Sequence, residues 1–132
     1  MSMELPIAPA LPANPGELRR AVTQIVDLSH LGHQTLGDPE LRRIVLRLFL
    51  DEAPGYARDI AAAKEAKSWR MAVHTIKGVA LNIGAFRLAQ LCKEHEGPTF
   101  GADGTAISEA SGALAAMIET TAHTIRELLS QG

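Results

Sequence analysis

The segment HTIKGVALNIGAFRLAQLCKEHE, residues 74–96, predicts two helices that meet at Gly84. Apolar residues recur every three or four positions on both sides of that glycine, and glycine readily takes the left-handed conformation that ends a helix. The first helix is expected to begin at Ser68, because serine is a favoured N-cap residue. Gly78 lies inside it, although a mid-helix glycine costs roughly 0.5–1 kcal/mol relative to alanine. A glycine at this position indicates a need for space one turn after His74.

Another long helix is predicted upstream, where Asp38 and Pro39 supply an N-cap residue followed by proline at the first helical position. The apolar residues that follow form a wide stripe and predict a well-buried helix: Leu41, Ile44, Val45, Leu46, Leu48, Phe49 and Leu50. Pro54 should kink or break this helix, because proline lacks the backbone N–H and clashes with the preceding turn. An alanine-rich helix is expected to resume over residues 56–67.

The two ends of the chain have different patterns. Residues 1–13 contain three prolines and no helical period, which predicts a flexible N-terminal arm. Asn14 and Pro15 then predict the start of a short helix, and residues 105–130 have the apolar spacing of a long one. Helices joined by short loops predict an all-α fold over residues 14–132, an up-down antiparallel four-helix bundle with an additional N-terminal helix.

The composition argues against several classes of function. The formal net charge is −2, so no basic excess favours a general nucleic-acid binder. Cys92 is the single cysteine, which rules out an internal disulfide and suits a reducing compartment. The start MSMELPIAPALPANP lacks the basic and continuously apolar regions of a secretory signal, and no apolar run reaches the ~18–20 residues of a membrane span. We therefore expect a cytoplasmic protein.

A helical wheel separates His74 from the core face of its helix. The core face lies more than ~100° away and consists of Trp69, Ala72, Ile76, Val79, Ala80 and Ile83. A second set lies within ~60° of the histidine: Lys67, Arg70, Met71, Lys77, Gly78 and Leu81. A neutral imidazole is a nucleophile, and neighbouring cations stabilise a dianionic group attached to it. From the wheel alone, two interpretations are equally good. His74 is either a phosphoryl acceptor or a surface histidine beside unrelated lysines, with Gly78 merely tolerated or allowing close helix packing.

The spacing of the segment separates these two interpretations. H-x-x-K-G-x-x-x-x-x-G-A followed by L-x-x-x-C-x-x-x-E resembles the signature of histidine-phosphotransfer (HPt) domains. The matching residues are His74, Lys77, Gly78, Asn82, Gly84, Ala85, Leu88, Cys92 and Glu96. The resemblance extends over about residues 26–130 and includes the G-D-P-E helix start at residues 37–40. It departs from the family at Val79, where many relatives carry a small polar residue and where this chain is expected to pack inward.

The resemblance implies a role for each residue of the motif. His74 would be phosphorylated, Lys77 would be the cation on the phosphate side, and Gly78 would keep the approach open. The domain would be a phosphocarrier rather than an enzyme. It would relay a phosphoryl group between receiver-domain aspartates, or from a sensor histidine kinase to a response regulator. It would need no cofactor of its own, because Mg²⁺ is expected in the partner receiver domain.

The partner is expected to dock on the same face of the helix. Met71 and Leu81 lie beside His74 on the wheel, with Lys67 and Arg70 around them. A small apolar patch ringed by cations suits a brief encounter with an acidic partner site. We expect a monomer that binds the receiver domain of a hybrid sensor kinase or of a response regulator, and neither nucleic acid nor membrane.

Three other functions fit the sequence less well. An ATP-dependent histidine kinase would need a nucleotide-binding pattern and an acidic residue after the histidine, but Thr75 follows His74. A metal site would draw on Asp27, His30 and His33 or on Cys92 and His95, yet the Glu-x-x-His pairs of di-iron bundles are missing. These histidines are expected at loops, helix edges and the seam between helices. A helical module that binds a receiver without transfer is the third, and the intact motif argues against it.

Overall fold

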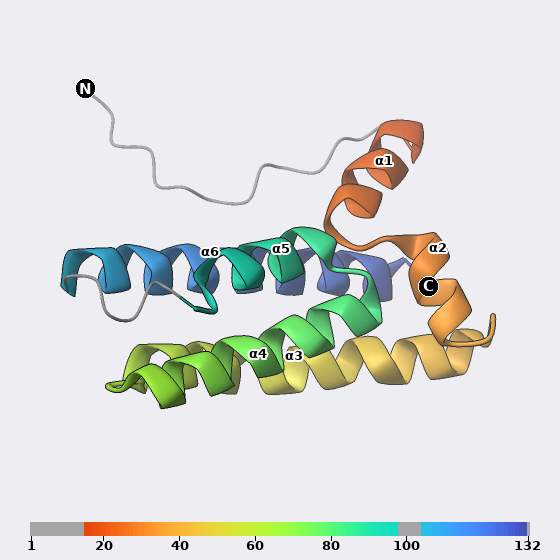
Figure 1. Ribbon diagram of the computed structural model, residues 1–132. Coiled ribbons are helices and arrows are strands. Elements are labelled where there is room, and N and C mark those ends of the chain that lie inside the picture. Colours follow the sequence, from red (N-terminus) through yellow and green to blue (C-terminus); the bar gives the residue numbers. More distant parts are fainter. Residues whose placement is uncertain (1–14, 98–103, 132) are drawn as a thin grey trace, which may run out of the picture.

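The computed structural model describes residues 15–97 and 104–131, and this part of the chain forms six α-helices and no strand (Figure 1). The helices are α1 (Pro15–Ile25), α2 (Leu28–Gln34), α3 (Pro39–Ala62), α4 (Ala66–Ile83), α5 (Phe86–His95) and α6 (Gly104–Ser130). The segment 1–13, for which the sequence predicts a flexible arm, and its boundary at Asn14 lie outside the described residues.

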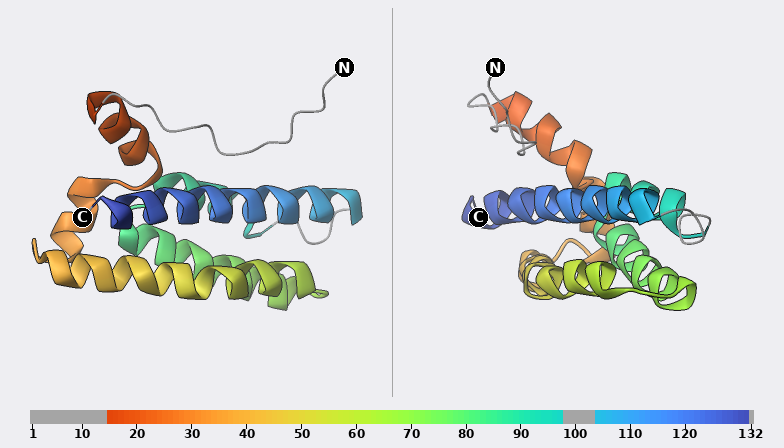
Figure 2. Two further views of the ribbon diagram at one scale, coloured as in Figure 1. Left: turned by 180° about the vertical axis from the view of Figure 1, so that it is seen from behind. Right: turned by 90° about the vertical axis from the view of Figure 1, so that its left-hand side faces the viewer.

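Helices α3 to α6 form the up-down antiparallel bundle that the sequence predicts. Figures 1 and 2 show α3 and α4 in one layer and α5 and α6 in the other, and contacts between α3 and α6 and between α4 and α5 join the layers. The N-terminal part differs from the expectation, because two helices precede the bundle where one is predicted. Helix α1 projects from one end, and α2 packs against α4. None of the described helices is long and apolar enough to cross a membrane.

Helix α2 escapes sequence analysis because it has only seven residues, too few for an apolar period to show. Its start is nevertheless locally defined, since the Asp27 carboxylate accepts a hydrogen bond from the backbone N–H of His30 at 3.0 Å. His30 and His33 therefore lie within a helix rather than in a loop.

The predicted break in α3 is wrong, since the helix runs without interruption from Pro39 to Ala62. Pro54 is exposed, on the solvent side of the helix, where a missing backbone hydrogen bond costs least. Buried residues on both sides of it, Ala53 and Ile60, attach the two halves to the same core. The separate helix predicted over 56–67 is thus the end of α3, a short connection and the start of α4.

The apolar stripe of α3 is also narrower than predicted. Leu46 and Phe49 are buried, but Ile44 and Leu48 are 54% and 57% exposed. A helix at the outside of a two-layer bundle presents only one face to the core, so apolar residues on its other face stay in water.

Both ends of α4 are set by local interactions. The helix begins two residues before the predicted Ser68, which lies at the third helical position, and the Ser68 hydroxyl accepts a hydrogen bond from the N–H of Glu65 at 3.3 Å. It ends as predicted at Gly84, which has φ +81°. A Cβ atom at Gly84 would lie 2.9 Å from the carbonyl oxygen of Asp27. Only glycine fits this corner, both for its backbone angle and for the close approach of the α1–α2 connection.

The predicted core face of α4 is confirmed. Trp69, Ile76, Ala80 and Ile83 are buried, and Ala72 and Val79 are partly buried. They pack with buried residues of every other bundle helix, among them Phe49, Leu88, Leu114 and Ile125. This packing determines the rotation of α4 about its axis and therefore which residues it presents to solvent.

Candidate functional site

His74 lies in the middle of α4 on the face opposite the core, and its side chain is 71% exposed. Gly78 follows one turn later, and a Cβ atom placed there would meet nothing within 4 Å. Close helix packing therefore does not explain this glycine. The surface beside the imidazole is open.

A carboxylate at the end of another helix contacts the imidazole. Glu96, directly after α5, places Oε1 2.7 Å from Nδ1 of His74 and Oε2 2.5 Å from Nζ of Lys77. Sequence reasoning placed Glu96 in the matching motif but gave it no role. An acidic neighbour of His74 thus comes from the end of α5, and the candidate site consists of His74, Lys77, Gly78 and Glu96.

The charge of Glu96 decides which nitrogen of His74 is available. The hydrogen bond from Lys77, followed by that from His74, holds the pKa of the Glu96 carboxyl below its usual value. An ionised carboxylate only accepts hydrogen bonds, so Nδ1 must carry the proton in this contact. In the neutral imidazole, the lone pair then lies on Nε2. The exposed ring has one nitrogen oriented by Glu96 and the other free to react.

A family comparison identifies the class of domain. The sequence model described as Hpt domain matches residues 44–130, which run from within α3 to the end of α6. The chain belongs to the Hpt domain family. Comparison with curated proteins and with solved structures gave no match. Hpt domains are phosphocarrier modules of two-component systems that interact with receiver domains, and they are not themselves enzymes.

The cations predicted around His74 of this Hpt domain lie in two different settings. Lys77 is only 24% exposed and is bonded to Glu96, so in this state its ammonium group neutralises a carboxylate. Lys67 and Arg70 are exposed on the same helix. The wheel alone suggests a purely cationic surface near His74. The structure shows instead a mixed surface, because a carboxylate lies beside Lys77.

The two apolar residues predicted for docking are both at the surface. Met71 is 61% exposed and Leu81 is 46% exposed. Neither side chain is buried in the core of the domain. They are available for contact with a partner on the His74 face.

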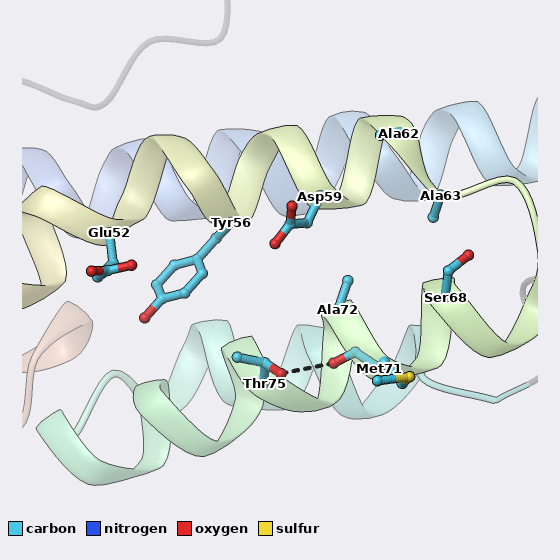
Figure 3. A pocket seen from close by; sticks show the side chains of 9 residues that line it. All are labelled: Glu52, Tyr56, Asp59, Ala62, Ala63, Ser68, Met71, Ala72 and Thr75. Carbon is cyan, nitrogen blue, oxygen red and sulfur yellow. Dashed lines mark hydrogen bonds between the residues drawn. The ribbon is translucent and has the colours of Figure 1, made fainter.

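An open groove of about 550 Å³ runs between α3 and α4 (Figure 3). Glu52, Tyr56 and Asp59 line it from α3, and Met71 and Thr75 are among the residues that line it from α4. Burial, and then the negative charge of Glu52, raises the pKa of the Tyr56 hydroxyl. No sequence pattern indicates this groove, because it depends on how α3 and α4 pack.

The residues considered for a metal site do not come together in this Hpt domain. Within residues 15–97 and 104–131, no three His, Cys, Asp or Glu side chains lie close enough to hold a metal ion. The ring of His30 packs edge-on against Phe86, with ring centroids 5.0 Å apart. Cys92 is buried, and burial, with a smaller effect of the Glu96 charge, raises the pKa of its thiol to about 12. A thiol with so high a pKa stays protonated at neutral pH and is a poor metal ligand, so Cys92 contributes to packing.

Proposed function

We propose that this Hpt domain relays a phosphoryl group through Nε2 of His74, between receiver-domain aspartates or from a sensor histidine kinase to a response regulator. The observation that carries the proposal is the exposed imidazole whose Nδ1 is held by the Glu96 carboxylate at 2.7 Å. It supports a nucleophile with a defined tautomer and a defined direction of attack.

The chemistry follows from that hydrogen bond. Nε2 attacks the phosphorus of an aspartyl phosphate, the N–P bond forms, and the bond from phosphorus to the aspartate oxygen breaks. The aspartate leaves as a carboxylate, and the proton stays on Nδ1. The imidazole gains positive charge as it attacks, and the Glu96 carboxylate stabilises this charge. Phosphoryl transfer needs mainly positioning and charge compensation, so the receiver has to supply the aspartate and Mg²⁺.

Lys77 and Gly78 complete the site in this proposal. The ammonium group of Lys77 is 2.5 Å from Glu96 before transfer, and a phosphoryl group on Nε2 would compete for it because a dianion attracts the cation more strongly. Gly78 leaves room for the receiver's active-site edge, since nothing stands within 4 Å of its Cβ direction. The reverse transfer uses the same geometry.

The receiver is proposed to dock over the exposed face of α4. Met71 and Leu81 would supply apolar contact, while Lys67 and Arg70 would attract the acidic residues around the receiver's aspartate. The groove beside Met71 would extend this contact surface toward α3. We place this reaction in the cytoplasm, with the domain acting as a monomer.

A transfer assay tests the proposal. A receiver domain carrying labelled phosphate is mixed with the wild-type domain, with His74→Gln and with His33→Gln as a matched control. His33 is also an exposed helical histidine, but it lies on α2. Wild type and His33→Gln should acquire acid-labile, base-stable label, and His74→Gln should acquire none.

The assay distinguishes the competing function as well. Label on His74→Gln would overturn the assignment of the phosphorylated residue. Binding of the receiver without label on the wild-type domain would instead favour an interaction module that does not transfer.

A further inference from the structure

We infer that Trp69 is a positioning residue for the phosphoryl-transfer site, acting on Glu96 through the backbone of His95. This inference rests on the proposed function of His74. Trp69 lies in the first turns of α4 and is completely buried. Its indole Nε1–H donates a hydrogen bond of 2.7 Å to the backbone carbonyl oxygen of His95.

The carbonyl group that accepts this hydrogen bond lies at the end of α5, next to Glu96. His95 is the last residue of α5, and Glu96 is the C-cap residue that follows it. The last four carbonyl groups of a helix have no partner within the helix, and helix ends fray for this reason. The indole N–H supplies a partner to the final one. It thereby holds the last turn of α5, from which the Glu96 side chain extends.

The end of α5 is thus attached to α4 at two depths. Inside the bundle, the buried indole holds the backbone of His95. At the surface, the carboxylate of Glu96 reaches His74 and Lys77, which lie five and eight residues after Trp69 on the same helix. One rigid helix therefore carries the indole, the reactive imidazole and the ammonium group, and α5 is aligned to all three.

Glu96 is held by an exposed contact with His74 and a partly buried contact with Lys77. Its side chain is 25% exposed and that of His74 is 71% exposed, so water competes for both groups. Exposed ion pairs hold their geometry weakly, whereas the donor of the indole bond is fully buried and the bond itself is partly buried, so it is better shielded from water than the exposed contact between His74 and Glu96. The indole bond therefore adds a shielded constraint on where the end of α5, and with it the Glu96 carboxylate, lies.

The test is Trp69→Phe, which keeps an aromatic ring in the core and removes the N–H donor. The first readout is the ¹⁵N chemical shifts of the His74 imidazole in the unphosphorylated domain, which report the proton's position between Nδ1 and Nε2. We expect the fraction with the proton on Nδ1 to fall. The rate of label transfer from a phosphorylated receiver should fall roughly three- to tenfold, the range of one net hydrogen bond.

A double-mutant cycle separates positioning from stability. In a Glu96→Ala background, Trp69→Phe should change neither the His74 tautomer nor the transfer rate any further, because the residue it positions is gone. Ile125→Val, a truncation of a buried residue on α6, is the control for general loosening of the core. It should leave the tautomer and the rate as in wild type.

Two results would overturn the inference: an unchanged His74 tautomer in Trp69→Phe, or an equal loss of transfer rate with and without Glu96. If Trp69→Phe does not fold, 3-benzothienylalanine at position 69 keeps the shape of tryptophan without its N–H and permits the same measurements. The tautomer readout needs no phosphoryl group. A wild-type domain that accepts no label would therefore refute the proposed function without deciding this inference.

Discussion

Gly78 offers the most direct test of how the His74 face is built. Nothing lies within 4 Å of a Cβ atom at this position, which is exposed in the interior of α4. A side chain there creates no clash, so the change in stability is that of helix propensity alone. Gly78→Ala should raise the free energy of unfolding by about 0.5–1 kcal/mol. For a domain of this size, the melting temperature should rise by about 2–5 °C.

The effect on transfer should depend on the size of the side chain. Side chains of a helix lean toward its N-terminus, so the residue at position 78 covers the surface one turn earlier, at His74. Gly78→Leu should therefore place a branched side chain over the imidazole and slow transfer in both directions by roughly tenfold or more, since small misplacements of reacting groups cost up to ~100-fold. The bundle should remain at least as stable as wild type.

Gly112 provides the matched control for this pair of variants. It is an exposed glycine inside α6, and a Cβ atom there also meets nothing within 4 Å. Gly112→Ala and Gly112→Leu should stabilise the domain similarly and leave transfer unchanged. Urea unfolding and label transfer from a phosphorylated receiver measure the two effects. Loss of stability in Gly78→Leu, or transfer at the wild-type rate, would refute the reasoning.

Two further predictions concern docking and pH. Met71→Ala and Leu81→Ala should weaken binding to the cognate receiver while changing stability by no more than about 0.5 kcal/mol, as expected for exposed positions. Titration calorimetry with thermal melts checks this, and Leu36→Ala, an 87% exposed apolar control on the α2–α3 connection, should leave affinity unchanged. Because partners in the folded domain lower the Glu96 pKa from 4.5, the stabilisation from its ionised form is present at neutral pH and is lost as pH falls through the folded pKa. In thermal melts from pH 7 to pH 3, Glu96→Ala should remove that part of the acid sensitivity, whereas the control Glu94→Ala should retain it. The same dependence of melting temperature on pH in wild type and Glu96→Ala would contradict the assignment.

Local sequence was sufficient to predict a structural feature wherever residues close together in the chain make all of its contacts. Asp38 accepts hydrogen bonds from the backbone N–H groups of Glu40 and Leu41, as an N-cap residue before Pro39 should. Gly84 ends α4 because its left-handed backbone suits no other residue as well. The exposure of His74 followed from helical periodicity, because a buried apolar face determines what the opposite face presents.

Packing overrode local preference in α3. Pro54 disfavours a helix locally, but the chain on both sides is buried against the same core and the helix continues through it. Ile44 and Leu48 are apolar yet exposed, because the number of apolar residues in a helix does not say how much of its surface neighbours will cover. Sequence periodicity identifies which face of a helix is apolar, whereas the packing of the bundle determines how much of that face is buried.

The sequence alone thus determined that His74, Lys77 and Gly78 share one helix face, since residues three and four apart on a helix are always neighbours. It could not place Glu96, which lies 22 residues from His74 and 19 from Lys77 along the chain. That contact depends on the turn at Gly84 and on the alignment of α5 against α4, to which the buried Trp69 contributes. Helix periodicity fixes relations within one helix, and only the packing of two helices decides which carboxylate reaches the imidazole.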